Sequence, residues 1–575
     1  MEPENTPSPS PQDVPPSPIP DGSPDLPPAA LLPPPKSRSA RRILVATGLI
    51  LSLLLVGGGA AAFVLMRGSG ELLLSKIPAS ANVVVVAYLD PSAGQKVNLM
   101  RMESRFPALG ASQQVGQNVN RALDTVLHRV GLDHTDAAWV GPEVAVTVDF
   151  SASGPPAAGI LLAASDESAA KASLQKLRGA PAAQALKWST EEYGGVQVSI
   201  GTSSSPGSSI SFAIVDGVVV IASDKQVVEG VIDAGQGKVA ALGASADFQK
   251  TMADLPTGKL GFAYVNPGSM LGILKQNPAF QAAAAGSGVG DLKAVKGIGV
   301  TLSAEPGGLA VDTSIRYDPA LLSPQTRALL SAPPHSNPLL KMIPAGAYGA
   351  YAQEHLDLTL KSLVDRLQAP GQGQGPSLAG PGFSDLLAVL SGDVAIEASP
   401  RAGGPFSGAL LLGTNDEAGM QSSLDSLAAF IPSITGGGGS WKTEQYKGVT
   451  IRYLHAVGRA GGSGRTPAFA VIKGAGVVAS SVDELHAIVD VSKGGASIAS
   501  TPGFASAIRA VPQAGSLLYL DVHRMVGGIL ATLPAYGRAA FDLGPGQNLE
   551  PIQSVVWGSG GDAGHQRSRL FIRIP

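Results

Sequence analysis

The longest uninterrupted apolar stretch of the chain runs from Ile43 to Met66, where no charged residue occurs. At a rise of about 1.5 Å per residue, a helix of this length would extend about 36 Å, more than the ~30 Å hydrocarbon core of a bilayer. Basic residues gather on its N-terminal side, at Lys36, Arg38, Arg41 and Arg42. The pattern predicts a transmembrane helix over residues 43–66, with a cytoplasmic N-terminus and an exported C-terminal region at the cell membrane.

A cleaved signal peptide is the alternative interpretation of the same stretch. Ala60, Ala61 and Ala62 supply small residues after an apolar core, as a cleavage site requires. Two features favour the anchor. The apolar run continues through Met66, and the tail before the apolar core is long for a secretory signal.

Beyond residue 66, apolar and polar segments recur twice in the same order, which indicates an internal duplication. Each copy opens with Ile-Pro-Ala, at Ile77 and at Ile343, followed by an apolar strand that reaches a Tyr. The clearest further matches are Gly159-Ile-Leu-Leu-Ala with Gly408-Ala-Leu-Leu-Leu, Trp188 to Val196 with Trp441 to Val449, and Phe212 to Ser223 with Phe469 to Ser480. Two of these segments contain glycines at their centres, at Gly195 and Gly448 or at Gly217 and Gly474, and predict tight hairpins.

One copy predicts the order strand, helices, hairpin, helix, two hairpins, two helices, strand, helix, hairpin. Crossover helices are too few for an all-parallel sheet. The predicted fold class is α+β, with two tandem similar lobes whose mainly antiparallel sheets are covered by helices, preceded by one transmembrane helix. The predicted parts are a Pro-rich disordered cytoplasmic tail (1–42), the transmembrane helix (43–66), lobe 1 (67–318), a connector (319–341) with a short helix around Thr326 to Leu330, and lobe 2 (342–575).

The composition of the chain excludes some classes of partner and of chemistry. The 575 residues carry a formal net charge of -3, without the basic surplus that binding to nucleic acid phosphates requires, so no nucleic acid partner is expected. Cysteine is absent, which excludes disulfides and thiolate chemistry. An exported region of this size without disulfides favours a bacterial cell envelope protein.

The opening Ile77-Pro-Ala with its strand ending Tyr88-Leu-Asp90, followed later by the segment Phe212 to Ser223, resembles a bacterial membrane-anchored family catalogued as a domain of unknown function. The resemblance covers roughly the exported part of the chain. It implies a location and a fold, and it implies no activity, ligand or site residue.

Possible metal ligands occur in two places. The densest group is His128, Asp133, His134 and Asp136. This segment resembles a helix end at Gly131, where the dipole favours a histidine without any metal, and the second copy lacks it. His355 beside Glu354 and Asp357 is an equally weak signal. No metal site is predicted.

Signals for catalysis are also weak. The Ser-x-x-Lys pairs Ser168/Lys171 and Ser173/Lys176 occur in a predicted polar helix without a Lys-Thr-Gly partner motif. The glycines of Gly235 to Ala240 follow a predicted helix, whereas a dinucleotide fingerprint needs a preceding strand. No catalytic residue and no cofactor are predicted.

The sequence therefore favours a non-enzymatic binding or structural module of the envelope, with an envelope protein, a lipid or a cell-wall component as ligand. Two alternatives stay open: an envelope hydrolase or cell-wall modifying enzyme with dispersed site residues, and a single-helix sensor. The copies differ most at Gly371 to Gly382 and at Gln95 to His134, so function is expected at a surface or groove made by the two lobes together.

Overall fold

The computed structural model describes residues 72–575, apart from 107–137, 151–155, 180–182, 185, 204–208, 275–288, 361–382, 402–403, 436–438, 457–465, 513–514 and 543–545. Within these residues the same series of elements occurs twice. We call residues 72–317 the first copy and residues 338–575 the second copy.

The strands of the first copy are β1 (Val83–Tyr88), β2 (Val140–Asp149), β3 (Ala157–Ala164), β4 (Lys187–Tyr193), β5 (Val196–Thr202), β6 (Ser209–Val215), β7 (Val218–Ala222), β8 (Gly261–Val265), β9 (Val295–Glu305) and β10 (Gly308–Tyr317). Those of the second copy are β11 (Gly349–Gln353), β12 (Leu390–Arg401), β13 (Gly404–Thr414), β14 (Gly439–Tyr446), β15 (Val449–Ala456), β16 (Ala468–Ile472), β17 (Ala475–Ala479), β18 (Ser516–Asp521), β19 (Ser554–Asp562) and β20 (His565–Arg573).

The helices also correspond between the copies. The first copy has η1 (Leu73–Ser75), α2 (Ala93–Glu103), α5 (Glu167–Gly179), α6 (Lys225–Gly235), η3 (Leu242–Ala244), α7 (Ala246–Met252), α8 (Pro267–Leu274) and η4 (Val289–Ala294). The second has η6 (Pro338–Met342), α12 (Phe383–Val389), α13 (Glu417–Thr435), α14 (Val482–Ser492), η7 (Ile498–Ser500), α15 (Pro502–Ile508), α16 (Val522–Thr532), α17 (Ala535–Asp542) and α18 (Gly546–Leu549). Between them, η5 (Pro319–Leu321) and α10 (Pro324–Ser331) form the connection, which confirms the predicted short helix.

Hydrogen bonding between neighbouring strands is antiparallel throughout and repeats from copy to copy. In the first copy β1 pairs with β2 and β8, as β11 pairs with β12 and β18 in the second. The first copy runs in the order β4, β5, β6, β7, β3, β2, β1, β8, β9, β10. The second runs in the equivalent order β14, β15, β16, β17, β13, β12, β11, β18, β19, β20.

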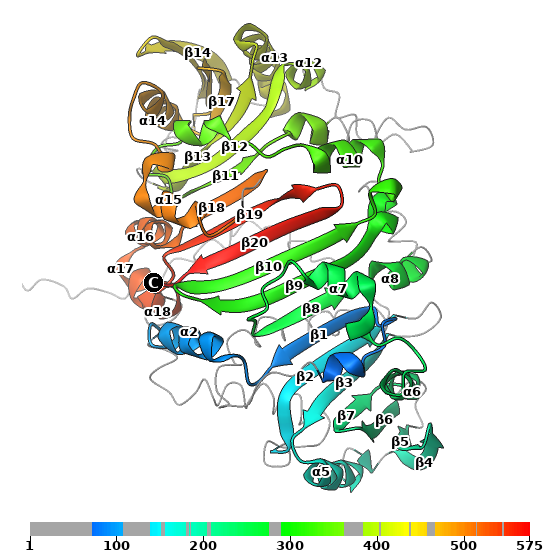
Figure 1. Cartoon of the computed structure of the whole chain (residues 1–575). Helices are drawn as coiled ribbons and strands as arrows, with labels where there is room; N and C mark the ends of the chain where they lie inside the picture. The colour runs from blue at the N-terminus through cyan, green and yellow to red at the C-terminus, as the bar shows by residue number, and fades with distance from the viewer. Residues whose placement is uncertain are drawn as a thin grey trace, which may run out of the picture. The chain divides into compact units, whose positions relative to one another are not determined.

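The predicted fold class is wrong in its division into separate sheets, whereas its α+β character fits the structure. Strands β10 and β20 pair antiparallel, from Gly308 with Arg573 to Arg316 with His565, so one twenty-stranded sheet runs through both copies (Figure 1). The physical reason is that each of these strands ends the strand order of its own copy. Its free N–H and C=O groups are satisfied by the equivalent edge of the other copy.

The transmembrane helix in the predicted fold class is likewise corrected. In the part of the chain that the structure describes, no helix has both the length and the apolar character needed to cross a membrane. The predicted span, residues 43–66, and the Pro-rich tail, residues 1–42, lie outside the described residues. The fold of the described residues is the continuous sheet with its helices alone.

The strand register also corrects one detail of the sequence match. Val144 pairs with Leu162 in the first copy, and Val394 pairs with Leu412 at the equivalent place in the second. Gly159 therefore corresponds to the residue after Gly408, one position away from the match that the glycines suggest. Because side chains alternate between the faces of a strand, this shift decides which residues share a face.

Strands β10 and β20 meet about a local two-fold axis. Gly308 and His565 are equivalent, since each pairs across its hairpin with an acidic residue, Glu305 or Asp562. At the joint between β10 and β20, Asp312 pairs with Arg569. Arg569 is also the residue of the second copy that is equivalent to Asp312. The position nearest the axis thus carries opposite charges in the two copies.

Helices α6 and α14 pack against the sheet through equivalent apolar faces, including Val228 and Ile232 in one and Ile488 and Val489 in the other. Each helix starts with a side-chain cap. The Asp224 carboxylate accepts a hydrogen bond from the Gln226 N–H, and the Ser481 hydroxyl accepts one from the Glu484 N–H. The C-terminal end of α14 lines a cavity of the second copy.

The predicted hairpins at Gly217 and Gly474 are confirmed: β6 pairs with β7, and β16 pairs with β17. Both central residues of each turn have positive φ, at 44° and 77° for Asp216 and Gly217, and at 43° and 78° for Lys473 and Gly474. This conformation suits the right-handed twist of the flanking strands. It holds Lys473 at the tip of its hairpin.

Candidate functional site

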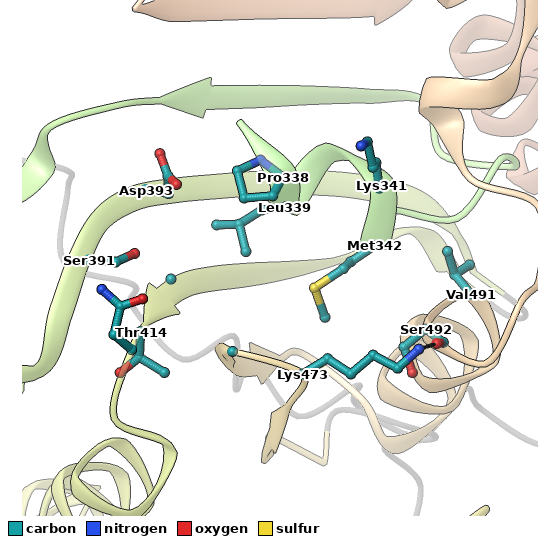
Figure 2. A pocket seen from close by; sticks show the side chains of 13 residues that line it. Pro338, Leu339, Lys341, Met342, Ser391, Asp393, Thr414, Lys473, Val491 and Ser492 are labelled. Carbon is teal, nitrogen blue, oxygen red and sulfur yellow. Dashed lines mark hydrogen bonds between the residues drawn. The ribbon is translucent and has the colours of Figure 1, made fainter. Parts of the chain in front are cut away.

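The second copy contains a cavity of about 380 Å³ between η6, the β12–β13 pair, the β16–β17 turn and the end of α14. Its lining combines two lysines, three hydroxyl side chains and apolar groups (Figure 2). The lining residues are Pro338, Leu339, Lys341, Met342, Ser391, Asp393, Gly413, Thr414, Asn415, Lys473, Gly474, Val491 and Ser492. We call this cavity the lysine pocket.

Two local features place the polar groups of the lysine pocket. Gly392 has φ of 96° and interrupts the regular register of β12, so Ser391 and Asp393 flank an irregular point of the strand. The Lys473 ammonium donates a hydrogen bond to the backbone carbonyl of Ser492, in the last turn of α14 (Figure 2). A cation at a helix C-terminus is favourable. An ammonium has three N–H donors, so this contact leaves donors for a ligand.

The charged groups of the lysine pocket differ in whether they have a partner of opposite charge. In the described part of the chain, Lys341 and Lys473 have no carboxylate partner, whereas the Asp393 carboxylate lies 2.7 Å from the Nε2 atom of His335. Lys341 is exposed. The pocket therefore offers two ammonium groups to an incoming ligand.

The first copy fills the equivalent place with an ion pair. Its residue equivalent to Met342 is Lys76 and its residue equivalent to Lys473 is Asp216, and the two side chains approach to 2.6 Å. Lys76 is buried beneath this contact. In the second copy, Lys473 occupies the position of the acidic residue Asp216, and Met342 occupies the position of the buried Lys76. The change removes the internal pairing and leaves positive charge at the cavity.

A second polar group unique to the second copy is a pair of buried carboxyls. Glu397 on β12 and Glu484 on α14 are 3% and 5% exposed. Burial, followed by the nearby Glu484 charge, raises the pKa of Glu397 to about 9, so this carboxyl is protonated at neutral pH. The Ser399 hydroxyl donates to Glu397 at 2.5 Å, and the Ser407 hydroxyl donates to Glu484.

This carboxyl pair does not line the lysine pocket. Its first-copy equivalents are Thr147 and Val227, neither of which is acidic. Paired carboxyls that share a proton occur in acid–base catalysis, but a substrate must be able to reach them. At these exposures Glu397 and Glu484 belong to the interior of the sheet and helix layer.

The structure brings Glu354 and His355 together with His335, a residue that no local sequence pattern marks. Asp357, the third residue of that sequence group, is not part of this cluster of described residues. The sequence carries no local signal for His335, because this residue lies nearly twenty positions before Glu354 and His355, within the predicted connector. Only the fold places it beside them.

The other sequence candidates give no site among the residues that the structure describes. His128, Asp133, His134 and Asp136, and most of the differing segments at 95–134 and 371–382, lie outside the described residues. The Ser-x-x-Lys residues lie on α5, where the Ser173 hydroxyl donates to the Ala169 carbonyl of its own helix. Gly235 ends α6, so no strand precedes the glycine segment.

The matched aromatic residues pack alike in both copies. The rings of Trp188 and Phe212 have centroids 5.6 Å apart, and those of Trp441 and Phe469 are 5.2 Å apart. Each indole N–H donates to a backbone carbonyl, of Ala183 or of Ala428. These residues stabilise the fold through packing.

Comparison with known proteins gives a family without a described function. No curated protein matches the chain. Among solved structures, crystal form III of TP0453 is similar at 11% identity over 46% of this chain and 88% of that one, with a TM-score of 0.21. Crystal form I of TP0453 gives 12% identity over 47% and 89%, with a TM-score of 0.22. Scores this low support no conclusion about fold or function.

The model of one protein family matches residues 46–433 and again residues 381–560. Together these matches cover most of the chain. The chain belongs to this family, DUF3352, which is described as a protein of unknown function.

Proposed function

We propose that this protein is a non-enzymatic binding module that holds an anionic ligand in the lysine pocket of its second copy. One observation carries the proposal: the Lys76–Asp216 ion pair of the first copy is replaced by Met342 and Lys473 beside a cavity of about 380 Å³. A volume of this size lies in the range of about 300–1,000 Å³ that small-molecule sites occupy.

The lining supports a ligand with an anionic head and a short apolar body. Lys341 and Lys473 supply positive charge, and Ser391 and Thr414 supply hydroxyl groups. Leu339 and Met342 supply an apolar surface. A phosphate or carboxylate head group would pair with the ammonium groups while its carbon chain contacts the apolar side. Envelope lipids and charged cell-wall fragments share this chemistry.

The buried position of Glu397 and Glu484 favours the binding role over the enzyme alternative. Neither carboxyl borders the lysine pocket, and both have serine partners that stabilise them in the interior. Neither Glu397 nor Glu484 is therefore placed to act as a general acid or base on a ligand in the lysine pocket.

Binding of hexyl phosphate tests the proposal. We expect the full chain to bind one equivalent of hexyl phosphate by calorimetry, and to bind inorganic phosphate and hexanol at least tenfold more weakly. In the double variant Lys341→Met/Lys473→Met, affinity for hexyl phosphate should fall at least about 100-fold, because each of the two charge-assisted hydrogen bonds that are lost contributes about 1.5–3 kcal/mol. Lys442→Met, which removes an exposed lysine outside the pocket, is the control.

Equal affinity for hexanol and hexyl phosphate would show that the lysines do not recognise the ligand. Unchanged binding in the double variant would place the site elsewhere. The single variant Lys341→Met keeps the Lys473 contact with α14, so it reports on binding even if the double variant loses stability. Its expected effect is about tenfold.

We also propose that binding takes place outside the cytoplasm. The support is the apolar run 43–66 with basic residues on its N-terminal side. Basic residues before an apolar run favour export of the chain that follows it. A reporter enzyme that is active only outside the membrane should work when fused after Pro575. Activity confined to a cytoplasmic reporter at the same position would contradict this location.

A further inference from the structure

A second group of polar side chains lies just before the start of η6 and just after the end of β11. His335, Glu354 and His355 each offer one ligand atom, and these three atoms lie within 4.8 Å of one another. The side chain of Glu354 is only 3% exposed, while that of His335 is 45% exposed. Two imidazoles and one carboxylate are the donor set of many zinc sites that keep an open position. We propose that these residues form a binding site for a divalent transition metal such as Zn²⁺.

The spacing of the donors fits a metal. The Nδ1 atom of His335 is 3.3 Å from an oxygen of Glu354. Two ligands on a tetrahedral zinc ion, each about 2.0–2.1 Å from it, are separated by about 3.3 Å. The rings of His335 and His355 are nearly perpendicular, with centroids 5.5 Å apart. The rings are therefore not stacked, and one nitrogen of each lies within 4.8 Å of the other donor atoms of the group.

Both histidines have a partner on their other ring nitrogen. The Nε2 atom of His335 is 2.7 Å from the Asp393 carboxylate, and the Nε2 atom of His355 is 3.2 Å from the carbonyl oxygen of Pro333. Metal-binding histidines characteristically donate their second N–H to a carboxylate or a backbone carbonyl, which fixes the tautomer and the ring orientation. Here this pattern leaves Nδ1 of each histidine for the metal.

The backbone holds the site in a costly conformation. His355 has φ of 57°, in the left-handed region that non-glycine residues rarely adopt. The Glu354 N–H donates to the carbonyl of Gly515, and the His335 N–H donates to the Glu354 carboxylate at 2.7 Å. Strain of this kind clusters at ligand sites, where the surrounding structure determines it.

Space for a further ligand lies beside the cluster. A cavity of about 180 Å³ is lined by Glu354 and His355 together with residues of α10, β18, β19 and β20. Three protein ligands with an adjacent cavity leave one coordination position for water or an exogenous donor. The proposed metal site is therefore exchangeable and accessible, unlike a closed structural zinc site.

The first copy lacks the site. The residues equivalent to Glu354 and His355 are Tyr88 and Leu89, as the matching strand registers show. Glu354 and His355 belong to the second copy, and His335 lies just before it, in the connection between the copies. Asp393 contributes both to this cluster and to the lysine pocket. The metal proposal rests on its own residues and does not depend on an anion in the lysine pocket.

Zinc binding by the full chain, produced without a histidine tag, tests the site. Competition with a chromogenic chelator should give one equivalent of Zn²⁺ with micromolar or tighter affinity. His335→Ala and His355→Ala should each weaken binding at least 30-fold, and Asp393→Asn about tenfold through the orientation of His335. His523→Ala removes an exposed histidine elsewhere and should bind like the wild type.

Thermal unfolding gives a second readout. Zn²⁺ should raise the unfolding temperature of the wild type and of His523→Ala, but not that of the double variant His335→Ala/His355→Ala. A wild-type chain that binds no Zn²⁺, Ni²⁺ or Co²⁺ would overturn the proposal and leave His335 as an ion-pair partner of the two carboxylates. Equal Zn²⁺ affinity of the double variant would also overturn it. Loss of hexyl phosphate binding with intact Zn²⁺ binding would instead contradict only the proposed function.

Discussion

Replacing Glu397 by glutamine should stabilise the protein at neutral and alkaline pH. The carboxyl is buried between β12 and α14 beside Glu484, and burial with that neighbouring charge raises its pKa to about 9. A glutamine has the shape of the protonated acid. Its amide oxygen can accept from the Ser399 hydroxyl, and its N–H can donate to Glu484.

The pH dependence follows from the direction of this shift. Because the folded protein holds the proton more tightly than the unfolded chain, the stability contributed by protonated Glu397 is complete below pH ~4.5 and declines as the pH rises toward 9. Each pH unit in this window costs up to about 1.4 kcal/mol. Glu397→Gln should therefore match the wild type near pH 4.5 and exceed its free energy of unfolding by on the order of 2–4 kcal/mol at pH 7.5.

Denaturant unfolding of both proteins at several pH values between 4.5 and 8.5 measures the difference. Glu550→Gln changes an exposed carboxyl outside the pair and should show no comparable pH-dependent gain. A Glu397→Gln protein that is less stable than the wild type at pH 7.5 would mean that Glu397 is ionised and paired in the fold. An equal offset at all pH values would contradict the proton linkage.

Local patterns in the sequence predict the elements of this fold because their signals are local. The glycine turns at Gly217 and Gly474 and the short helix around Thr326 to Leu330 rest on neighbouring residues. The β10–β20 joint has no such signal. It is made by backbone groups of strands about 250 positions apart, and backbone hydrogen bonding does not depend on side-chain identity.

The functional candidates were hidden for a different reason. The residues that match between the copies, such as Trp188 and Trp441, serve packing. The positions that point to the lysine pocket are those where the copies differ: Asp216 is equivalent to Lys473, and Lys76 is equivalent to Met342. Those mismatches are visible in the sequence once the copies are aligned. That they lie side by side at a cavity is visible only in the fold.

Reversing the charge of Arg569 should destabilise the joint between the copies more than any other single surface change on these strands. Its guanidinium contacts Glu305 and lies 3.5 Å from Asp312, its own equivalent across the local two-fold axis. The side chains of Arg569 and Asp312 are 21% and 13% exposed. An aspartate at position 569 would gather three carboxylates in a partly buried place.

Breaking a buried or nearly buried ion pair costs about 3–5 kcal/mol, so we expect Arg569→Asp to lower the free energy of unfolding by roughly that amount. Burial raises the pKa of Asp312, and the Arg569 charge opposes that effect. Without Arg569 the pKa of Asp312 should rise further. The variant should therefore regain part of its stability as the pH falls, because protonation removes the repulsion.

The local two-fold relation between the copies suggests a double variant that restores a pair of opposite charges. In the double variant Asp312→Arg/Arg569→Asp the opposite charges exchange places, and Asp562, the equivalent of Glu305, becomes the second acidic neighbour of the arginine. This exchange should restore at least half of the lost free energy in denaturant unfolding, with a coupling energy between positions 312 and 569 above about 1 kcal/mol. Arg567→Asp, at an exposed position on the same face of β20, should change stability by less than about 1 kcal/mol. A double variant that is no more stable than Arg569→Asp would show that these charges do not hold the two copies together.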